Sequence, residues 1–347
     1  MSDTQRLTLA RIHTLAESIL KIHGFSTDQA DAIAATVTAA ERDGCQSHGL
    51  FRIPFYVKAL ENAHADPTAV PTCRITDSSI VHVDAHGGFC PLALRVGTPA
   101  VADKARRHGI AALAIHDTYN IAALWPEVEQ LAEQGFVAFA FTTSNAYVAP
   151  SGGTQALYGT NPMGFGFPRK GQLPLVFDQA SSASARGEIQ LHQREGKALP
   201  EGWAIDATGA PTTDADAALA GAQLPFGGYK GASIALMVEL LAGVLIGENL
   251  SAESTLADTH RVGAPLGGEF IMVINPAHCS GTTDHLARAE SLFAAVLDQP
   301  GTRLPSQRRY NMRKLHLRQG VDVSRIMLAQ LEELDQTPTL VPVTQGP

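Results

Sequence analysis

The chain has 347 residues, with 26 Lys and Arg against 34 Asp and Glu and a formal charge of −8. Hydrophobic residues make up 45% and charged residues 17%, a composition that excludes a disordered chain. The acidic balance argues against a nucleic-acid partner, because neutralising phosphates requires clustered Lys and Arg. The length is enough for about two domains.

Patterns for a membrane span, a signal peptide or a disulfide framework are missing from the sequence. The longest apolar stretch, 232–247, contains Glu239 and is shorter than the about 20 residues that cross a bilayer. Residues 1–20 lack a charged segment followed by an apolar block. The four cysteines stand far apart without a CxxC pair: Cys45, Cys73, Cys90 and Cys279. We therefore expect a cytoplasmic protein with reduced thiols and no membrane partner.

Helices and strands alternate irregularly in the first part of the chain. Ser26 and Gln29 form a capping pattern ahead of apolar residues at helical spacing, and Gly44 ends that helix. Periodicity then predicts a helix at 50–62, a strand at 79–84, a helix at 92–107, a strand at 110–115, a helix at 123–134 and a strand at 136–142.

The second part begins with a turn-rich stretch. Gly, Pro, Ser and Asn are frequent in 144–231, where strands are expected to be short. An apolar helix at 230–247, a strand at 269–275, a helix at 283–298 and a final helix at 322–335 follow. The irregular order predicts an α/β fold of the mixed α+β kind.

One loop carries residue types suited to moving a proton and holding an acid. Ser47, His48 and Gly49 follow the first capped helix, and Arg52 comes four residues after His48. Histidine exchanges protons near neutral pH, and the arginine fork binds a carboxylate. The structural alternative is a loop histidine beside a surface arginine.

Three further segments suit ligand binding, each with a structural alternative. Residues 158–168, with Thr160, form a Gly/Asn/Pro cluster that allows close backbone approach, or an ordinary tight loop. Residues 225–231, with Lys230, lead from glycines into a helix start that can hold an anion, or simply begin a buried helix. The basic segment 303–314 either holds a phosphate or forms a solvated face.

The standard fingerprints of nucleotide, phosphate and metal sites are missing. The sequence has no GxGxxG after a strand, no GxxxxGK[ST], no HExxH and no GxSxG. His82, Asp84 and His86 alternate on one strand face, which suits a metal or, more commonly, a polar solvent face. We expect no metal.

Taken in order, five segments resemble one family over almost the whole chain: RDGCQSHGLFRIPFY, GTNPMGFGFP, LPEGWAIDATGAPT, LPFGGYKGASIALMVELLAG and RLPSQRR. They resemble the malate/L-lactate (sulfolactate) dehydrogenase family of non-Rossmann NAD(P)H oxidoreductases. RDG, SHG, FRIP and the AALWPE segment at 122–127 are most similar to its delta-1-piperideine-2-carboxylate/delta-1-pyrroline-2-carboxylate reductases. The resemblance implies reduction of these cyclic imino acids to L-pipecolate and L-proline.

The resemblance also implies the architecture and the partners. A non-Rossmann cofactor domain with a predominantly antiparallel sheet, at 119–279, stands beside a helical catalytic and dimerisation domain, at 1–118 and 280–347. The cofactor is NADPH, with NADH possible, the substrate carries a carboxylate, and the protein is a homodimer. Two alternatives remain: an NAD(P)-dependent dehydrogenase of a 2-hydroxy acid such as malate, lactate or a sugar-derived acid, and a ligand-binding protein without turnover.

Site residues follow from the resemblance position by position. His48 matches the proton donor, Ser47 its relay neighbour and Glu188 the relay carboxylate, which is usually Asp. Arg52 matches the clamp on the substrate carboxylate, and Thr160 a substrate contact. The positions that match cofactor contacts are His116, Asp117, Thr118, Tyr119, Asn120, Phe177, Asp178, Gln179, Lys230, Arg303, Arg308 and Arg309. Asn120 replaces an expected His.

Overall fold

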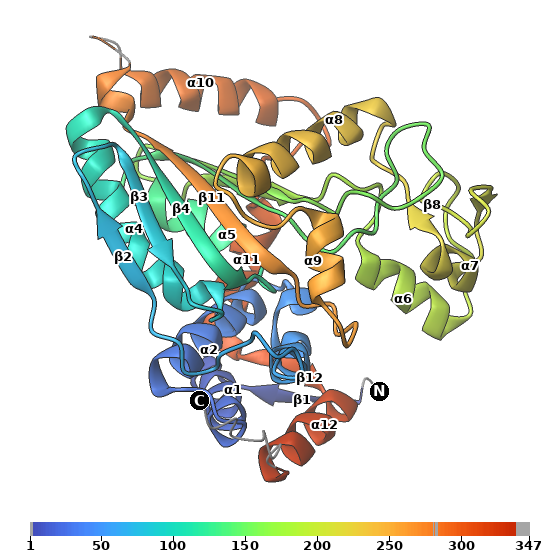
Figure 1. The fold of residues 1–347 in the computed structure, drawn as a ribbon. Coiled ribbons are helices and arrows are strands. Elements are labelled where there is room, and N and C mark those ends of the chain that lie inside the picture. Colours follow the sequence, from blue (N-terminus) through green and yellow to red (C-terminus); the bar gives the residue numbers. More distant parts are fainter. Residues whose placement is uncertain (1–2, 280, 282–283, 338–347) are drawn as a thin grey trace.

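The computed structural model describes residues 3–279, 281 and 284–337 and is built around a seven-stranded sheet (Figure 1). All neighbouring strands of the sheet are antiparallel except β3 and β4, which confirms the predicted, predominantly antiparallel sheet. In spatial order the strands are β2 (Thr72–Ile75), β3 (Ile80–Asp84), β4 (Ile110–Tyr119), β11 (Leu266–Ile274), β5 (Val137–Thr142), β6 (Met163–Phe167) and β7 (Leu175–Gln179).

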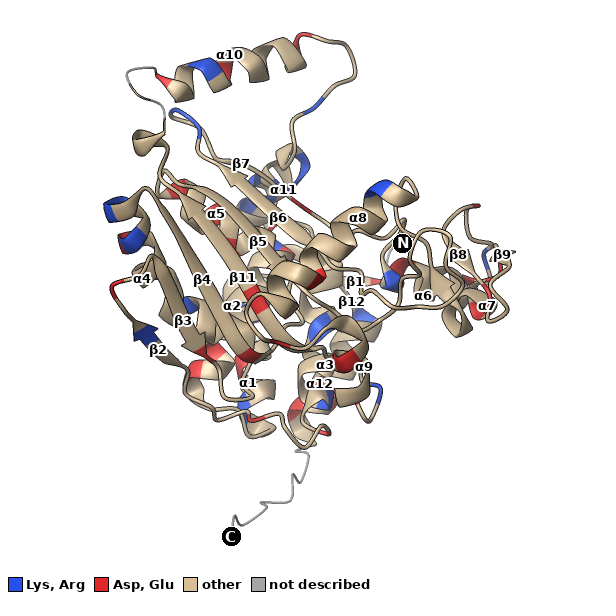
Figure 2. Ribbon diagram, turned by 45° about the horizontal axis from the view of Figure 1, so that its top comes forward, with Lys and Arg blue, Asp and Glu red and all other residues tan. Residues whose placement is uncertain are grey.

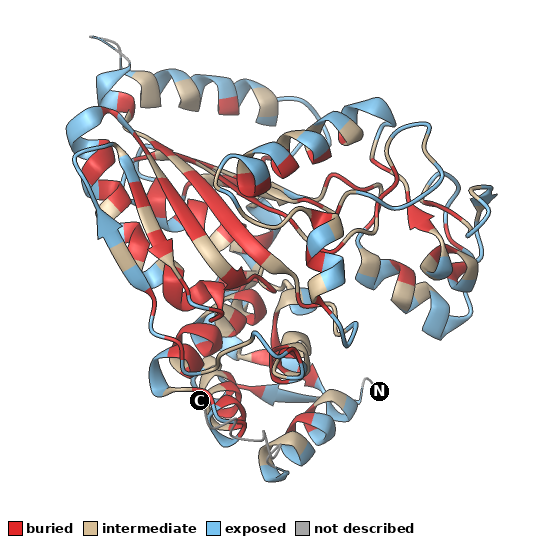
Figure 3. Ribbon diagram, viewed as in Figure 1, coloured by how far each residue is buried: buried red, intermediate tan, exposed pale blue. Residues whose placement is uncertain are grey.

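Helices cover both faces of the sheet. On one face, α4 (Cys90–His108) and α5 (Trp125–Glu133) enclose an apolar core of residues such as Val83, Leu113 and Ile271. On the other face, α8 (Tyr229–Val238) and the π-helical turn η3 (Glu239–Val244) pack on Phe141 and Phe270. The central strands are therefore buried on both sides (Figure 3).

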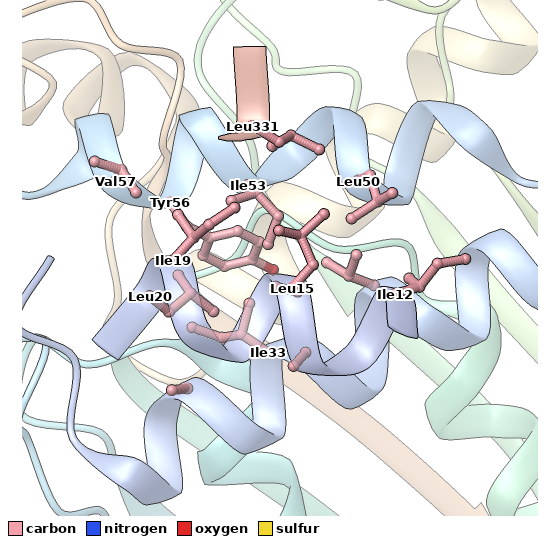
Figure 4. Close-up of a cluster of buried hydrophobic side chains, with 14 of the residues drawn as sticks. Ile12, Leu15, Ile19, Leu20, Ile33, Leu50, Ile53, Tyr56, Val57 and Leu331 are labelled. Carbon is pink, nitrogen blue, oxygen red and sulfur yellow. The ribbon is translucent and has the colours of Figure 1, made fainter. Parts of the chain in front are cut away.

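A helical part stands below the sheet in Figure 1 and joins both ends of the described chain. Its helices are α1 (Leu9–Ile22), α2 (Thr27–Arg42), α3 (Ile53–Ala59) and α12 (Arg325–Gln336). The short strands β1 (Thr4–Leu7) and β12 (Val321–Ser324) pair antiparallel. Figure 4 shows its core, where Ile12, Ile33 and Tyr56 are among the packed side chains.

A small substructure between β7 and α8 lies beside the sheet (Figure 1). It consists of α6 (Arg186–Glu195), α7 (Ala215–Ala220) and a three-stranded sheet of β8 (Ala204–Ile205), β9 (Pro211–Thr212) and β10 (Ala222–Gln223). The remaining elements are η1 (Gln46–His48), η2 (Leu50–Arg52), α9 (Ser251–Ala257), η4 (Pro276–His278), α10 (His285–Leu297) and α11 (Gln307–Gln319).

Most of the predicted elements are confirmed. The Ser26 hydroxyl caps α2 by accepting the Gln29 N–H at 3.3 Å, as the capping pattern predicts. The expected helix at 50–62 is shorter, because it opens with the 3-10 turn η2 and α3 ends at Ala59. Residue 283, the expected start of the helix at 283–298, lies outside the described residues.

Further differences concern strands β4 and β6. The Gly-rich loop expected at 158–168 contains strand β6, and the expected strand at 110–115 continues to Tyr119. The expected domain boundary at 118/119 falls inside β4, so the sheet draws strands from both sides of it. In the part of the chain that the structure describes, no helix is long and apolar enough to cross a membrane.

Candidate functional site

The loop that joins α2 to α3, residues 45–52, brings three predicted site residues together. The Ser47 hydroxyl oxygen lies 3.0 Å from Nδ1 of His48. The Arg52 Nε donates a hydrogen bond to the Ser47 carbonyl oxygen at 2.8 Å. The 3-10 turns η1 and η2 fold the loop back on itself, so a hydroxyl, an imidazole and a guanidinium converge.

Salt bridges fix the base of this loop to the sheet side of the molecule. Asp43, the C-cap of α2, is buried and accepts two hydrogen bonds from Arg313 of α11, at 2.8 and 2.5 Å. Arg313 also pairs with Glu129 of α5 at 2.6 Å. One buried arginine therefore ties the loop, α11 and α5 together.

Burial controls the electrostatics of the loop. Burial of the imidazole and, to a smaller extent, the positive charge of Arg52 lower the pKa of His48 to about 3. The imidazole is therefore neutral near pH 7. Burial also lowers the pKa of Arg52, while the Tyr56 and Tyr147 hydroxyls act against that shift. The Arg52 guanidinium lies 5.2 Å from the centre of the Phe55 ring. A desolvated cation beside apolar rings attracts an anion more strongly than one in water.

Tyr147 and Arg186 extend the site, and the sequence analysis missed both. The Arg186 guanidinium lies 4.0 Å from the centre of the Tyr147 ring. Tyr147 also acts electrostatically on Arg52, where it raises the pKa of the guanidinium. Tyr147 follows β5 and Arg186 opens α6, so the small substructure faces the 45–52 loop here. The sequence carried no signal for this pairing beyond the residue types themselves.

Thr160 lies in a separate hydroxyl cluster. Its N–H donates to the Ser144 oxygen at 2.9 Å, and its carbonyl accepts the Ser181 N–H at 2.8 Å. The next residue, Asn161, is buried with a φ of 36°, and its amide bonds to Glu239 of η3 at 2.8 Å. The cluster leaves Thr160 half-buried on a backbone that is firmly held.

Glu188 is not brought to His48. It lies exposed in the first turn of α6, and its carboxylate is 3.9 Å from His192 one turn later. Within the described residues no hydrogen bond or ion pair joins it to the 45–52 loop. The relay role of Glu188 stays a prediction, because the structure does not bring its carboxylate to His48.

The 116–120 segment is the end of a central strand rather than a loop. The Thr118 and Tyr119 side chains are each 1% exposed, and Tyr119 packs on Phe89. His116 lies 3.1 Å from both His82 and Glu248, and Asp117 bonds to His64. Direct cofactor contacts from the Thr118 and Tyr119 side chains therefore have no support in this geometry.

Asn120 belongs to a buried acidic cluster that the sequence analysis missed. Its amide donates to Oε2 of Glu269 at 2.6 Å, and the Cys90 thiol donates to the same oxygen at 3.0 Å. Burial raises the pKa of Glu269 to about 7, and it also raises the pKa of Glu127, where the Glu269 charge adds to the effect. Burial therefore favours the protonated form of both carboxyl groups.

The predicted cofactor residues of β7 and the C-terminal segment divide into two groups. Arg309 is buried, donates to the Val176 carbonyl at 3.0 Å, and lies 3.7 Å from Asp178 and 4.8 Å from the Trp125 ring centre. Phe177 packs on Phe165, and Gln179 is exposed. The free cations are Lys230, Arg303 and Arg308, which are exposed without an ion pair to any described carboxylate. Figure 2 shows basic residues on α8 and at α11.

These free cations fit a phosphate-bearing dinucleotide. Lys230 stands in the first turn of α8, just after Gly227 and Gly228, which both have positive φ. A glycine turn into a helix start leaves backbone N–H groups open to an anion. Burial raises the pKa of the Cys45 thiol to about 11, and the Arg309 and Arg308 charges oppose that rise. Arg308 therefore lies near the 45–52 loop.

The histidines of β3 make no metal site in the structure. His82 bonds to His116, and His86 lies beyond the strand with a φ of 51° and its Nε2 near Thr72. No group of three or more His, Cys, Asp or Glu side chains suited to a metal occurs among the described residues.

Comparison with known proteins gives the family. A profile of the malate/L-lactate dehydrogenase family matches residues 7–332. The chain is 48% identical over 333 residues to the delta(1)-pyrroline-2-carboxylate/delta(1)-piperideine-2-carboxylate reductase of Pseudomonas aeruginosa, covering 94% of this chain and 99% of that protein. It is 45% identical to the delta(1)-pyrroline-2-carboxylate reductase of Ancylobacter novellus, covering 96% and 98%.

A solved structure supports the same relationship. The crystal structure of the delta1-piperideine-2-carboxylate reductase from Pseudomonas syringae superimposes with a TM-score of 0.91 at 40% identity, covering 95% of this chain and 100% of that one. Such a family of dehydrogenases and reductases implies a nicotinamide cofactor. On sequence and on fold, the chain belongs to the malate/L-lactate dehydrogenase family of oxidoreductases.

Proposed function

We propose that this protein reduces cyclic 2-imino acids, delta-1-pyrroline-2-carboxylate and delta-1-piperideine-2-carboxylate, to L-proline and L-pipecolate with NADPH. The names of its relatives at 40–48% identity support this substrate class. The observation that carries the proposal is the convergence of Ser47, His48 and Arg52 on one loop. Such a set suits an anionic acceptor that needs one proton.

Arg52 binds the substrate carboxylate in this proposal. Its Nε is used by the Ser47 carbonyl, which fixes the plane of the guanidinium and leaves the two terminal nitrogens for a forked contact. The forked contact orients the planar C=N group next to the carboxylate. When bound, the nicotinamide supplies a hydride to the imine carbon, and the nitrogen gains a proton to become a secondary amine.

His48 holds or supplies that proton. It is neutral in the free protein, because burial and the Arg52 charge disfavour the imidazolium. A substrate carboxylate on Arg52 offsets the second of these causes, so binding raises the proton affinity of His48. The Ser47 hydroxyl, 3.0 Å from Nδ1, supports one ring orientation and leaves Nε2 as the nitrogen for the substrate.

The preference for NADPH rests on the free cations. Arg303 lies just before α11 and Arg308 lies in its first turn, and both are exposed. The additional phosphate that distinguishes NADPH from NADH would bind favourably next to these positive charges. An Arg303→Ala, Arg308→Ala double variant is expected to raise the KM for NADPH and leave that for NADH nearly unchanged. Equal KM values for the two cofactors in the unmodified protein would contradict the preference.

A second copy of the chain is the proposed partner. Leu236, Leu240 and Val244 stand one helical turn apart on α8 and η3 and are exposed, as is Leu245. Contiguous exposed apolar side chains are typical of protein interfaces. A Leu240→Glu variant is expected to run as a monomer in size-exclusion chromatography with light scattering, where the unmodified protein runs as a dimer.

The first experiment compares substrates side by side. NADPH oxidation is followed with delta-1-piperideine-2-carboxylate, delta-1-pyrroline-2-carboxylate, pyruvate and oxaloacetate. Fast oxidation with the imines and little with the oxo acids supports the proposal. The reverse result would make the protein a 2-hydroxy acid dehydrogenase, and cofactor binding without turnover of either class would make it a binding protein.

A further inference from the structure

Glu41 lies directly beneath the 45–52 loop and has no part in the chemistry described above. It stands in the last turn of α2, and only 3% of its surface is exposed. Its carboxylate Oε1 accepts the Leu50 N–H at 2.8 Å. Because burying a carboxyl group is unfavourable unless something compensates, a position this enclosed calls for an explanation.

The Leu50 N–H lies where the two 3-10 turns of the loop meet. The neighbouring amides bond within the loop: His48 N to the Cys45 carbonyl at 2.9 Å, Gly49 N to Gln46 at 3.1 Å and Arg52 N to Gly49 at 2.9 Å. Leu50 begins the second 3-10 turn, and Glu41 is the acceptor for its N–H. The carboxylate therefore sets how the turn with His48 joins the turn with Arg52.

Gly49 shows how closely the carboxylate follows the loop. A Cβ at this position would lie 2.1 Å from Glu41 Oε1 and 2.5 Å from its Cδ. The φ of Gly49 is −88° and its ψ is −141°, a combination outside the regions that other residues favour. Both the backbone conformation and the Glu41 carboxylate therefore exclude a side chain at residue 49, and the carboxylate is the atom group that a Cβ would meet.

We propose that Glu41 is a positioning residue for the reaction: through the Leu50 N–H, its carboxyl group fixes the 45–52 loop so that His48 and Arg52 face one substrate. The proposal rests on the proposed function for the roles of His48 and Arg52. Burial of Glu41 by the loop also agrees with its raised pKa, which the Leu50 N–H partly offsets.

The main test compares Glu41→Ala with Glu41→Gln. The amide oxygen of Gln can still accept the Leu50 N–H, whereas Ala leaves that N–H unpaired. We expect kcat/KM for the imine to fall by roughly 10- to 100-fold in Glu41→Ala and by less than about threefold in Glu41→Gln. The Kd for NADPH is expected to stay unchanged in both variants.

Gln29 gives a matched control on the same helix. It is buried, and its Nε2 donates to the Ala69 carbonyl at 3.0 Å, so Gln29→Ala also removes a buried hydrogen bond between α2 and another segment. Gln29→Ala is expected to lower Tm while leaving kcat/KM unchanged. A fall in kcat/KM equal to that of Glu41→Ala would overturn the proposal, since the effect would then be general destabilisation.

A double-variant cycle tests the contact itself. Gly49→Ala is expected to lower kcat/KM strongly because its methyl group meets the carboxylate, and to do less harm in the Glu41→Ala background, where that carboxylate is gone. Additive effects would contradict a direct contact. The same coupling must appear in kcat rather than in NADPH affinity.

Hydrogen exchange separates this proposal from the proposed function. Protection of the Leu50 amide is expected in the unmodified protein and in Glu41→Gln, and to be lost in Glu41→Ala, whatever the substrate. If no imine is reduced but this pattern holds, the proposed function fails and the positioning contact stands. If imines are reduced and Leu50 exchanges equally in all three, Glu41 does not position the loop.

Discussion

The 45–52 loop and the 116–120 segment both match functional motifs, yet their side chains lie in opposite environments. In the loop, the Ser47, His48 and Arg52 side chains converge while the backbone is held from below by Glu41. In the 116–120 segment, Thr118 and Tyr119 are buried, since the Thr118 hydroxyl donates to the Gly88 carbonyl and the Tyr119 ring packs on Phe89. A motif therefore identifies a place in the fold, and burial decides which of its side chains can meet a ligand.

The basic segment before and within α11 repeats this contrast between neighbours. Arg308 is exposed and unpaired with any described carboxylate, while Arg309 is 9% exposed and bonded to a backbone carbonyl. Arg313, one turn further on, holds Asp43 and Glu129. Residue type alone would assign one role to all three.

Of the changes in the 45–52 loop, removal of the His48 imidazole is expected to have the largest effect on catalysis. His48→Ala is expected to lower kcat for imine reduction by roughly a hundred- to ten-thousandfold, because the positioned proton carrier is lost. The Kd for NADPH, measured by fluorescence titration, is expected to stay unchanged. A variant with near-normal kcat would show that the proton comes from elsewhere.

The buried arginine at the base of the loop should dominate stability. Arg313→Ala removes the cation that pairs with both Asp43 and Glu129 and leaves Arg42 as the remaining partner of these buried carboxylates, which is expected to lower the free energy of unfolding by about 2–4 kcal/mol. Urea denaturation measures this change. Arg318→Ala, an exposed residue on the same helix, is the control and is expected to unfold like the unmodified protein.

Glu41 should make stability depend on pH. Its pKa rises from 4.5 to about 7 on folding because it is buried, so folded chains bind a proton that unfolded chains have released between these values. Stability is then highest below pH 4.5, falls as pH rises to about 7 and is level above. Between pH 5 and pH 8 the unmodified protein is expected to lose about 2–3 kcal/mol more than Glu41→Gln. Equal losses in urea denaturation would contradict the assignment.

The sequence predicted local features and failed on contacts between distant segments. Ser26 and Gln29 marked the start of α2 because a cap is local, and His48 and Arg52 share one loop. Glycines at 164 and 166 made β6 look like a loop, yet they are small because α5 packs on that strand: a Cβ at Gly166 would lie 2.4 Å from the Val128 carbonyl oxygen. The pairing of Tyr147 with Arg186, and of Asn120 with Glu269, joins segments that no periodicity connects.

The two adjacent arginines of α11 give a smaller and more specific test. Arg308→Ala is expected to raise the Kd for NADPH roughly tenfold without changing stability, since its charge is free. Arg309→Ala is expected to lower the free energy of unfolding by about 1–3 kcal/mol, because it removes one of the two side-chain donors to the Val176 carbonyl, the other being the Ser306 hydroxyl, and leaves Asp178 without its cation. The contrast fails if Arg309→Ala is as stable as Arg308→Ala.

The smallest effect is expected inside the 116–120 segment, and it tests the comparison most directly. The Tyr119 hydroxyl is buried with no hydrogen-bond partner among the described residues, so Tyr119→Phe removes an unpaired polar group and is expected to leave stability unchanged or raise it by up to about 1 kcal/mol. The Kd for NADPH should also stay the same, because the ring faces Phe89 rather than solvent. Asn120→Ala, which removes a donor from buried Glu269, is the destabilising counterpart in the same segment. Weaker NADPH binding in a fully folded Tyr119→Phe protein would show that this strand end reaches the cofactor with its side chains, and the contrast with the 45–52 loop would then be one of degree.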